Sequence, residues 1–288
     1  MDNRFYQHSE KSTPINLGIA IVISFIIAIL FAYVYNILIL IIPIVYVNVF
    51  ITGIFAAALG YTSKFISRLA KIRNSRHNLV LAALTGFSGF YFQWIAYAAF
   101  LNTNSLWFDA YISHFNFIYN PIGFLTAIIE FSKVGSWSMF DVTFRDFPLW
   151  IIWTIEAGMI IGFPIFIMIK HPIVPFSEQL DHWYPRYRLT YEFEKITMRI
   201  KFNEDLLSNP EATISALTYG APGRYSEVII YYLKDEQIQY LSVDNVLLED
   251  RGSKKDIDHV VQLLKIDTTT AELLMKKYGN KKEFALNY

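Results

Sequence analysis

The feature that most constrains this chain is a long run of uncharged residues near its start. From Ser12 to Ser63, 52 consecutive residues include no Asp, Glu, Lys, Arg or His. A soluble fold cannot bury so much uncharged sequence in one stretch, whereas a bilayer can, because about 20 apolar residues in a helix cross its hydrocarbon core. We therefore expect an integral membrane protein. The low share of charged residues, 17% against about 25% in soluble domains, points the same way.

Four membrane-spanning helices are predicted. The uncharged run holds two of them, joined by a turn near Asn36 and Pro43, and two more follow. The segment 110–129 is also apolar, but His114 and the Asn120–Pro121 step interrupt it. We expect it to lie at the membrane interface, with a fifth span as the alternative. The four predicted spans are residues 15–36, 43–63, 78–101 and 147–169.

The basic residues of the short loops predict the orientation, because Lys and Arg concentrate on the cytoplasmic side. The loop after the second span contains five basic residues and no acid, so we expect it in the cytoplasm. The loop 102–147 is mainly acidic and is expected outside. With four spans both termini are cytoplasmic, in the cytoplasmic membrane of a bacterium. The five basic residues are Lys64, Arg68, Lys71, Arg73 and Arg76.

The composition changes abruptly after the fourth span. Residues 171–288 hold 15 of the 25 basic and 18 of the 25 acidic residues, and they are numerous enough for one small domain with its own core. The predicted layout is a cytoplasmic N-terminal segment (1–14), a four-helix transmembrane domain (15–170) with an extracytoplasmic loop (102–147), a juxtamembrane linker (171–186) and a cytoplasmic α+β domain (187–288).

Charge and cysteine content exclude several classes of function. Basic and acidic residues balance at 25 each, so there is no general case for nucleic-acid binding. The chain has no cysteine, which excludes disulfides, thiolate zinc sites, iron–sulfur clusters and cysteine nucleophiles. The sequence has no nucleophile motif and no paired catalytic carboxylates. Glu178, Asp181 and His182 could bind a metal if that stretch were helical, but no second cluster completes the ligand set, so we expect no metal and no cofactor.

Glu156 is the one charged residue inside a predicted span, and its cost in lipid calls for an explanation. It and Gln93 each lie about eight residues from the outer end of their spans, or about 12 Å deep at 1.5 Å per residue. Asn48 and Thr52 lie near that depth. We expect these four side chains to form an intramembrane polar cluster. It is either a proton- or cation-linked site, or a protonated Glu156 that hydrogen-bonds a neighbouring helix.

Small residues recur at spacings of four within the spans, which lets helix backbones approach closely. This pattern predicts a compact bundle and leaves a homo-oligomer open. The pairs are Gly53 with Ala57, Ala56 with Gly60, Ala82 with Gly86, and Gly158 with Gly162.

Alternating apolar residues predict two antiparallel hairpins in the cytoplasmic domain. The first turns at Glu194–Lys195 and pairs Phe193 with Ile196. The second turns at Lys234–Glu236 and pairs Tyr231 with Tyr240.

Helices are expected after each hairpin of this domain. One covers 204–217 with an interruption at Pro210, and one begins after an N-cap at Ser253 with its apolar face at Ile257, Val260, Val261 and Leu264. A last helix, 269–278, ends at Gly279. The order of elements predicts an α+β fold with helices on an antiparallel sheet.

Three stretches resemble a family of multi-pass bacterial membrane proteins. Pro175–Glu178 followed by Trp183–Tyr184 is similar to a juxtamembrane pattern of that family, Pro-Phe-Cys-Glu before a second Cys and Trp-Tyr, which looks like half of a zinc site. Ser177 and Leu180 occupy the cysteine positions here, so this resemblance implies no metal role. It implies a four-span layout and no particular activity. The other two stretches are Ile42–Asn48 and Lys71–Asn74.

The leading hypothesis is a non-enzymatic membrane protein that docks a cytoplasmic partner through its C-terminal domain, as a scaffold or sensor subunit. The alternative is a small proton- or ion-coupled channel or transporter component centred on Glu156. A membrane-bound enzyme ranks third, because His114, Asp141 and Asp146 of the outer loop could meet, although nothing in their spacing favours it. The expected partners are the lipid bilayer and a protein or a second copy of the chain.

Overall fold

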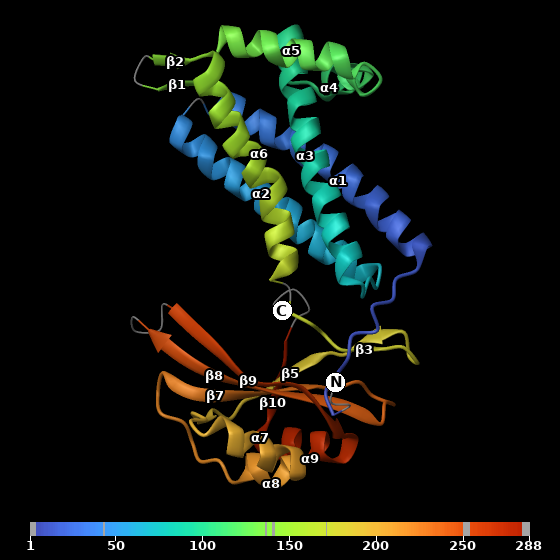
Figure 1. Cartoon of the computed structure of the whole chain (residues 1–288), viewed down its shortest axis with the longest axis vertical. Helices are drawn as coiled ribbons and strands as arrows, with labels where there is room; N and C mark the ends of the chain where they lie inside the picture. Colours follow the sequence, from blue (N-terminus) through green and yellow to red (C-terminus); the bar gives the residue numbers. More distant parts are fainter. Residues whose placement is uncertain are drawn as a thin grey trace. The chain divides into compact units, whose positions relative to one another are not determined.

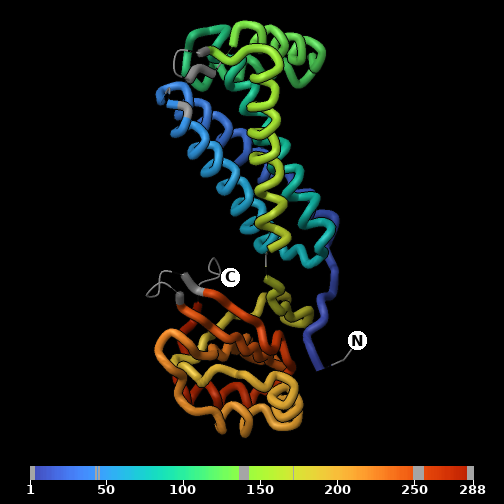
Figure 2. The backbone as a smooth tube through the Cα atoms, turned by 60° about the vertical axis from the view of Figure 1, so that its left-hand side comes forward, coloured from blue at the N-terminus to red at the C-terminus, as the bar shows by residue number. Residues whose placement is uncertain are grey.

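A computed structural model describes residues 4–42, 44–135, 137–139, 142–170, 172–249 and 254–283. The chain forms two compact units (Figure 1 and Figure 2). One is a helical bundle of residues 9–171. The other is an α+β domain made of residues 172–288 together with residues 1–8. Several residues that the predictions name, or that bound a predicted segment, lie outside the described residues, among them Pro43, Asp141, His171 and Ser253.

Four long helices build the bundle: α1 (Pro14–Ile41), α2 (Val45–Leu69), α3 (Ser75–Thr103) and α6 (Asp146–Ile169). Each is long and apolar enough to cross a membrane. Helices α2 and α3 each pack against the other three long helices. Of the two positions predicted for the turn, Asn36 and Pro43, only the first is wrong, because the connection to α2 begins after Ile41. Helix α1 continues to Ile41, about 42 Å in length at 1.5 Å per residue. The Asn36 side-chain nitrogen donates to the carbonyls of Ala32 and Gln93 inside the bundle.

Short elements connect α3 to α6 across one end of the bundle (Figure 1). They are α4 (Phe108–Ser113), the 3-10 helix η1 (His114–Ile118), α5 (Pro121–Val134) and the hairpin β1 (Trp137–Met139) and β2 (Val142–Phe144). The Asn120 side chain caps α5 by accepting from the Gly123 N–H at 2.9 Å. The 14 residues of α5 extend about 21 Å, too short to cross the hydrocarbon core, so segment 110–129 is not one continuous span.

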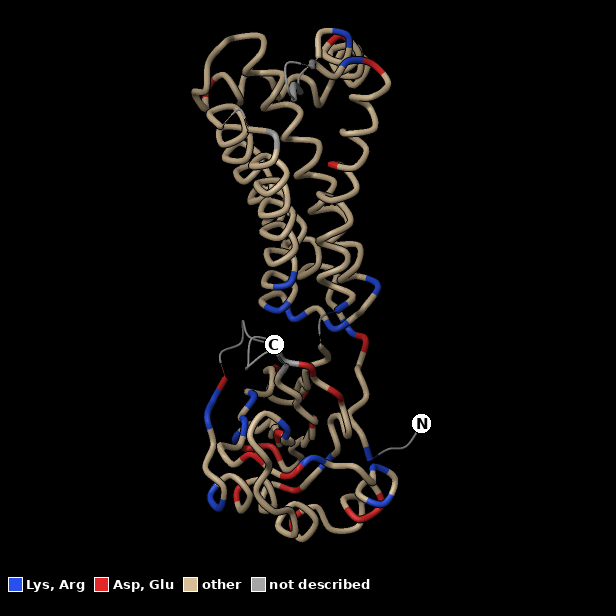
Figure 3. Tube along the Cα trace, turned by 90° about the vertical axis from the view of Figure 1, so that its left-hand side faces the viewer, with Lys and Arg blue, Asp and Glu red and all other residues tan. Residues whose placement is uncertain are grey.

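Lys and Arg residues gather at the opposite end of the bundle (Figure 3). They lie on the last turns of α2, in the α2–α3 connection and at the start of α3. The Asn74 side chain caps α3 by accepting from the His77 N–H at 3.0 Å. Arg73 donates to the Ser9 hydroxyl at 3.2 Å and to the Lys71 carbonyl at 2.8 Å, which holds this connection against residues that precede α1.

The α+β domain is built on an antiparallel sheet with the strand order β10-β5-β7-β8-β9, and β6 also pairs with β7. Its strands are β5 (Arg186–Leu189), β6 (Phe193–Glu194), β7 (Arg224–Tyr231), β8 (Ile238–Glu249), β9 (Lys254–Asp267) and β10 (Asn280–Lys282). Helices α7 (Arg199–Ser208), α8 (Pro210–Ser215) and α9 (Thr268–Tyr278) cover one face (Figure 1). The core between them includes Phe193, Leu206, Ile214, Val243 and Leu274.

The opposite face of the sheet carries a second, aromatic core. The short hairpin β3 (Phe176–Ser177) and β4 (His182–Trp183) lies there with the N-terminal segment. Phe5 forms an antiparallel bridge with Leu264 of β9, and the Tyr6 N–H donates to the Leu263 carbonyl at 2.9 Å. Residues that precede the first long helix therefore extend a sheet made by the end of the chain.

Two predictions for this domain are confirmed. Tyr231 pairs with Tyr240 in the β7–β8 hairpin, and the last helix ends at Gly279, whose φ of 65° suits glycine. The hairpin at Glu194–Lys195 is wrong, because β5 and β6 both pair with β7 and the chain then enters α7.

The helix predicted over Ile257–Leu264 is also wrong, because these residues belong to β9. Its helical spacing comes from irregularities in the strand pairing. Leu241 pairs with Leu264 but Val243 pairs with Val261, so an extra residue in β9 places Val261 and Leu264, three residues apart, on the same face.

Candidate functional site in the helical bundle

Tyr35 of α1 lies at the centre of the polar contacts inside the bundle. Its hydroxyl contacts the Glu156 carboxyl oxygen Oε1 of α6 in a short hydrogen bond and lies 2.9 Å from the Thr52 hydroxyl of α2. Tyr35 and Thr52 are each 3% exposed, whereas Glu156 is half-buried. The Tyr35 ring stacks on Phe55 with centroids 4.6 Å apart, which fixes the hydroxyl between the two partners. The three groups tie three helices together.

Thr52 extends this contact along α2. Its hydroxyl donates to the backbone carbonyl of Asn48 at 2.9 Å, one turn earlier in the helix. The side-chain oxygen of Asn48 is buried and has no hydrogen-bond partner among the described residues. Asn48 therefore joins the Glu156 contacts through its main chain.

Asn36 connects α1 to α3 beside this site. Its side-chain nitrogen donates to the Gln93 carbonyl at 2.8 Å and to the Ala32 carbonyl at 3.1 Å. The remaining atoms, Asn36 Oδ1 and Gln93 Nε2, are buried without a partner in the described part of the chain. An unsatisfied buried polar group costs about 1–3 kcal/mol, which makes these two side chains unusual in an apolar bundle.

The structure thus joins some of the predicted residues and separates others. Glu156 and Thr52 share the Tyr35 hydroxyl, and Gln93 meets Asn36 through its backbone with no hydrogen bond to Glu156 in the described structure. Sequence reasoning missed Tyr35 and Asn36. Their signal was present, because these polar residues occupy the last two turns of a helix that is otherwise almost entirely apolar.

The small residues differ in what they contact. A Cβ on Gly86 would lie 2.9 Å from the Ile161 Cα, so α3 and α6 meet there backbone to backbone. Gly60 is similarly close to Pro164 of α6. Gly53 has only Met159 at 4.0 Å, Ala57 is half-buried, and Gly158 and Gly162 face open space in the described structure.

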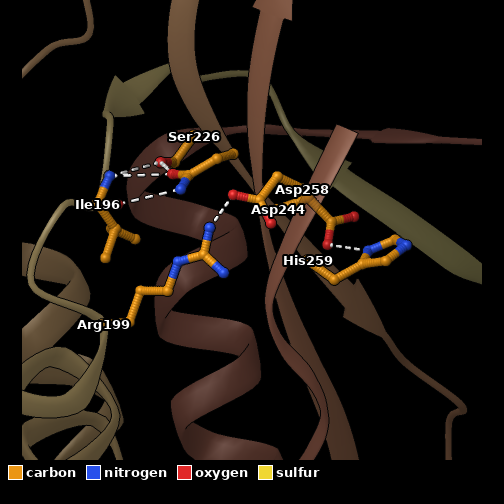
Figure 4. A network of polar contacts seen from close by, with 7 residues as sticks. Ile196, Arg199, Ser226, Asp244, Asp258 and His259 are labelled. Carbon is orange, nitrogen blue, oxygen red and sulfur yellow. Dashed lines mark hydrogen bonds and ion pairs between the residues drawn. The ribbon is translucent and has the colours of Figure 1, made fainter. Parts of the chain in front are cut away.

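Polar groups in the α+β domain form a separate network (Figure 4). Arg199, at the start of α7, pairs with Asp258 of β9, and His259 lies 2.7 Å from Asp244 of β8. Asp258 and His259 also line a cavity of about 540 Å³. Its lining includes Lys195, Asn245, Asp256 and Asp258.

Two buried carboxylates lie opposite each other on the face away from the helices. Glu227 pairs in register with Asp244, and each is 6% exposed. Arg188 of β5 compensates Glu227 at 2.9 Å. Burial is the largest single influence on Arg188 and acts to lower its pKa, but the charge and hydrogen bond of Glu227, together with the Glu283 charge, outweigh it and the net pKa is raised. Burial, with Glu227 nearby, also raises the pKa of Tyr225.

The fold and this site define a chain with four long apolar helices and a C-terminal region of antiparallel strands and helices. Comparison with protein-family models, with curated proteins and with solved structures finds no match. The resemblance noted for Pro175–Glu178 therefore carries no family assignment, and function is inferred from the chain's own geometry.

Proposed function

We propose that this protein is a non-enzymatic sensor or scaffold subunit of a bacterial cytoplasmic membrane, which docks a cytoplasmic partner through its α+β domain. The observation that carries the proposal is the pairing of Phe5 with Leu264. It makes the segment before α1 part of the C-terminal domain, so this domain is attached to the helices at two points, before α1 and after α6. A change in the bundle has two routes to the domain that meets the partner.

The same pairing supports the four-span layout. Residues that pair in one sheet lie on one side of a bilayer, so the chain crosses an even number of times between Phe5 and Leu264. Four helices meet the length and hydropathy needed for crossing. The basic residues between α2 and α3 support a cytoplasmic location for both ends.

A disulfide experiment tests whether the N-terminal segment is attached to the α+β domain. Because the chain has no cysteine, an introduced pair can form a disulfide only with each other within the chain. The backbone bonds from Tyr6 to Leu263 and from Lys265 to Arg4 flank the Phe5–Leu264 pair, which brings its side chains close. We expect a Phe5→Cys/Leu264→Cys variant to crosslink in oxidised membranes. A Phe5→Cys/Leu273→Cys control, with the second cysteine exposed on α9, is expected not to crosslink. No crosslink in the first variant would contradict the attachment.

Docking is tested by purifying the full chain in mild detergent after crosslinking in cells. We expect one partner to co-purify in stoichiometric amount, and to be lost when the attachment is broken by Phe5→Asp. Ile15→Asn, at an exposed position on α1, is the control that leaves the attachment intact. Recovery of the chain alone in every preparation would refute the docking proposal.

A further inference from the structure

The contacts around Tyr35 need one proton more than the hydroxyl groups of Tyr35 and Thr52 supply. Three oxygen–oxygen contacts follow one another, from Glu156 to Tyr35, from Tyr35 to Thr52 and from Thr52 to the Asn48 carbonyl. Each contact needs one proton, and each hydroxyl supplies one. With an ionised carboxylate, Tyr35 and Thr52 supply two protons for three contacts. A proton on Glu156 completes the chain.

With that proton every donor and acceptor is used in one direction. The Glu156 carboxylic acid donates to Tyr35, the Tyr35 hydroxyl donates to Thr52, and Thr52 donates to the Asn48 carbonyl. When the proton leaves, Tyr35 donates to the carboxylate instead and Thr52 turns toward Tyr35. The two states differ in the direction of the hydrogen bonds and need no movement of the heavy atoms.

A metal cation does not fit these contacts. Cations hold oxygen ligands at about 2.0–2.6 Å and lie between them, which spreads the oxygens farther apart than a hydrogen bond does. Tyr35 lies within hydrogen-bond distance of both Glu156 and Thr52. Both contacts are those of oxygens joined by a hydrogen bond.

In the described part of the chain, no ion pair competes with a proton for Glu156. The sequence has no other charged residue or His in 12–63, 79–108 or 147–169, which form most of the four long helices. On α5, which also packs against α6, Glu130 and Lys133 pair with each other at 2.8 Å. Among the described residues, Tyr35 is the titratable group hydrogen-bonded to Glu156.

We propose that Glu156 is a reversible proton-binding site, and that Tyr35 and Thr52 reverse their hydrogen bonds when it titrates. The carboxyl O–H bond breaks, its electron pair stays on the carboxylate, and the proton passes to water. The reversal links α6, α1 and α2, so protonation is an input that a sensor could register. Proton binding at Glu156 does not require a partner on the α+β domain.

Infrared spectroscopy of the full chain in lipid vesicles tests this directly, because the C=O stretch of a carboxylic acid is separate from that of a carboxylate. We expect an acid band at neutral pH that Glu156→Gln removes and that converts reversibly to carboxylate as the pH rises. Tyr35→Phe and Thr52→Val are expected to retain the band and shift its frequency, because each breaks the chain at a different link. Glu130→Gln is the matched control and leaves the band unchanged.

Each contrary result would overturn a defined part of the proposed proton-binding site. A wild-type spectrum without the acid band, or a band that survives Glu156→Gln, excludes the proton on Glu156. A band that persists at every pH at which the protein stays folded makes Glu156 a permanently neutral packing group. A frequency unaffected by Tyr35→Phe removes the proposed chain. If Glu156→Gln fails to fold, the pH titration and the Tyr35→Phe shift decide the question.

Discussion

Asn245 is a side chain whose loss should destabilise the α+β domain strongly. It is 2% exposed and makes three hydrogen bonds, all to buried groups. Its oxygen accepts from the Ile196 N–H at 3.0 Å and from the Ser226 hydroxyl at 2.7 Å, and its nitrogen donates to the Ile196 carbonyl at 3.0 Å (Figure 4). It therefore fixes the chain between β6 and α7 onto the sheet.

The magnitude follows from what Asn245→Ala would leave behind. The Ile196 carbonyl loses its side-chain partner, while the Ile196 N–H retains only the longer bond to Ser226, at 3.3 Å. Each lost bond costs about 0.5–1.5 kcal/mol, and a stranded buried group costs about 1–3 kcal/mol. We expect a loss of about 3 kcal/mol.

Hydrogen exchange measures this loss without requiring the whole membrane protein to unfold in one step. A change of 3 kcal/mol corresponds to exchange on the order of 100-fold faster for amides that open with the domain. Peptides from β8 report it. The control is Asn280→Ala, which removes one exposed bond of 3.4 Å and should change exchange little. Equal effects from the two variants would refute the assignment of Asn245 as the anchor.

Three further predictions concern other parts of the chain. Gly86→Ala should lower the thermal stability of the bundle in detergent by about 1–3 kcal/mol, because its Cβ would meet the Ile161 backbone, whereas Gly18→Ala, in open space, should be tolerated. Asp267→Ala should cost about 1 kcal/mol at neutral pH, because the Thr270 N–H and hydroxyl lower the pKa of the Asp267 carboxyl at the N-cap of α9. This stabilisation is present above the unfolded pKa of about 3.9 and is lost as the pH falls through the lower folded value, so melting curves of the two proteins should converge in acid. Tyr35→Phe should destabilise the bundle by about 1–3 kcal/mol in the same thermal assay, because the Glu156 carboxyl loses its partner, and an unchanged midpoint would contradict this.

The long helices could be predicted from the sequence because hydropathy over 20 residues depends on composition alone. Prediction from the sequence fails where a residue's structure depends on a contact with a residue distant in the sequence. Asn36 suggested a turn because a polar residue in an apolar run often marks one. Its place inside α1 is explained by its bonds to a carbonyl of the same helix and to the distant Gln93 carbonyl of α3. Counting residues from the ends of the spans placed Glu156 and Thr52 at a similar depth in the membrane. It could not show that the Tyr35 hydroxyl joins them.

The errors in the α+β domain have the same origin. The apolar spacing from Ile257 to Leu264 fits a helix as well as it fits a strand with extra residues, and the pairing with β8 decides between them. Similarly, local alternation predicted a hairpin at Lys195. The partner that holds Ile196 is Asn245, 49 residues later, which no local pattern contains.

The bridge between Phe5 and Leu264 has a consequence for how the molecule is made. All four long helices lie between Phe5 and Leu264 in the sequence and are synthesised between them. Phe5 therefore has no strand to pair with while these helices are being made. That edge of the sheet can close only after Leu264 has been translated. The segment around Phe5 is among the first described residues to be synthesised, and we expect it to be among the last to reach its final position.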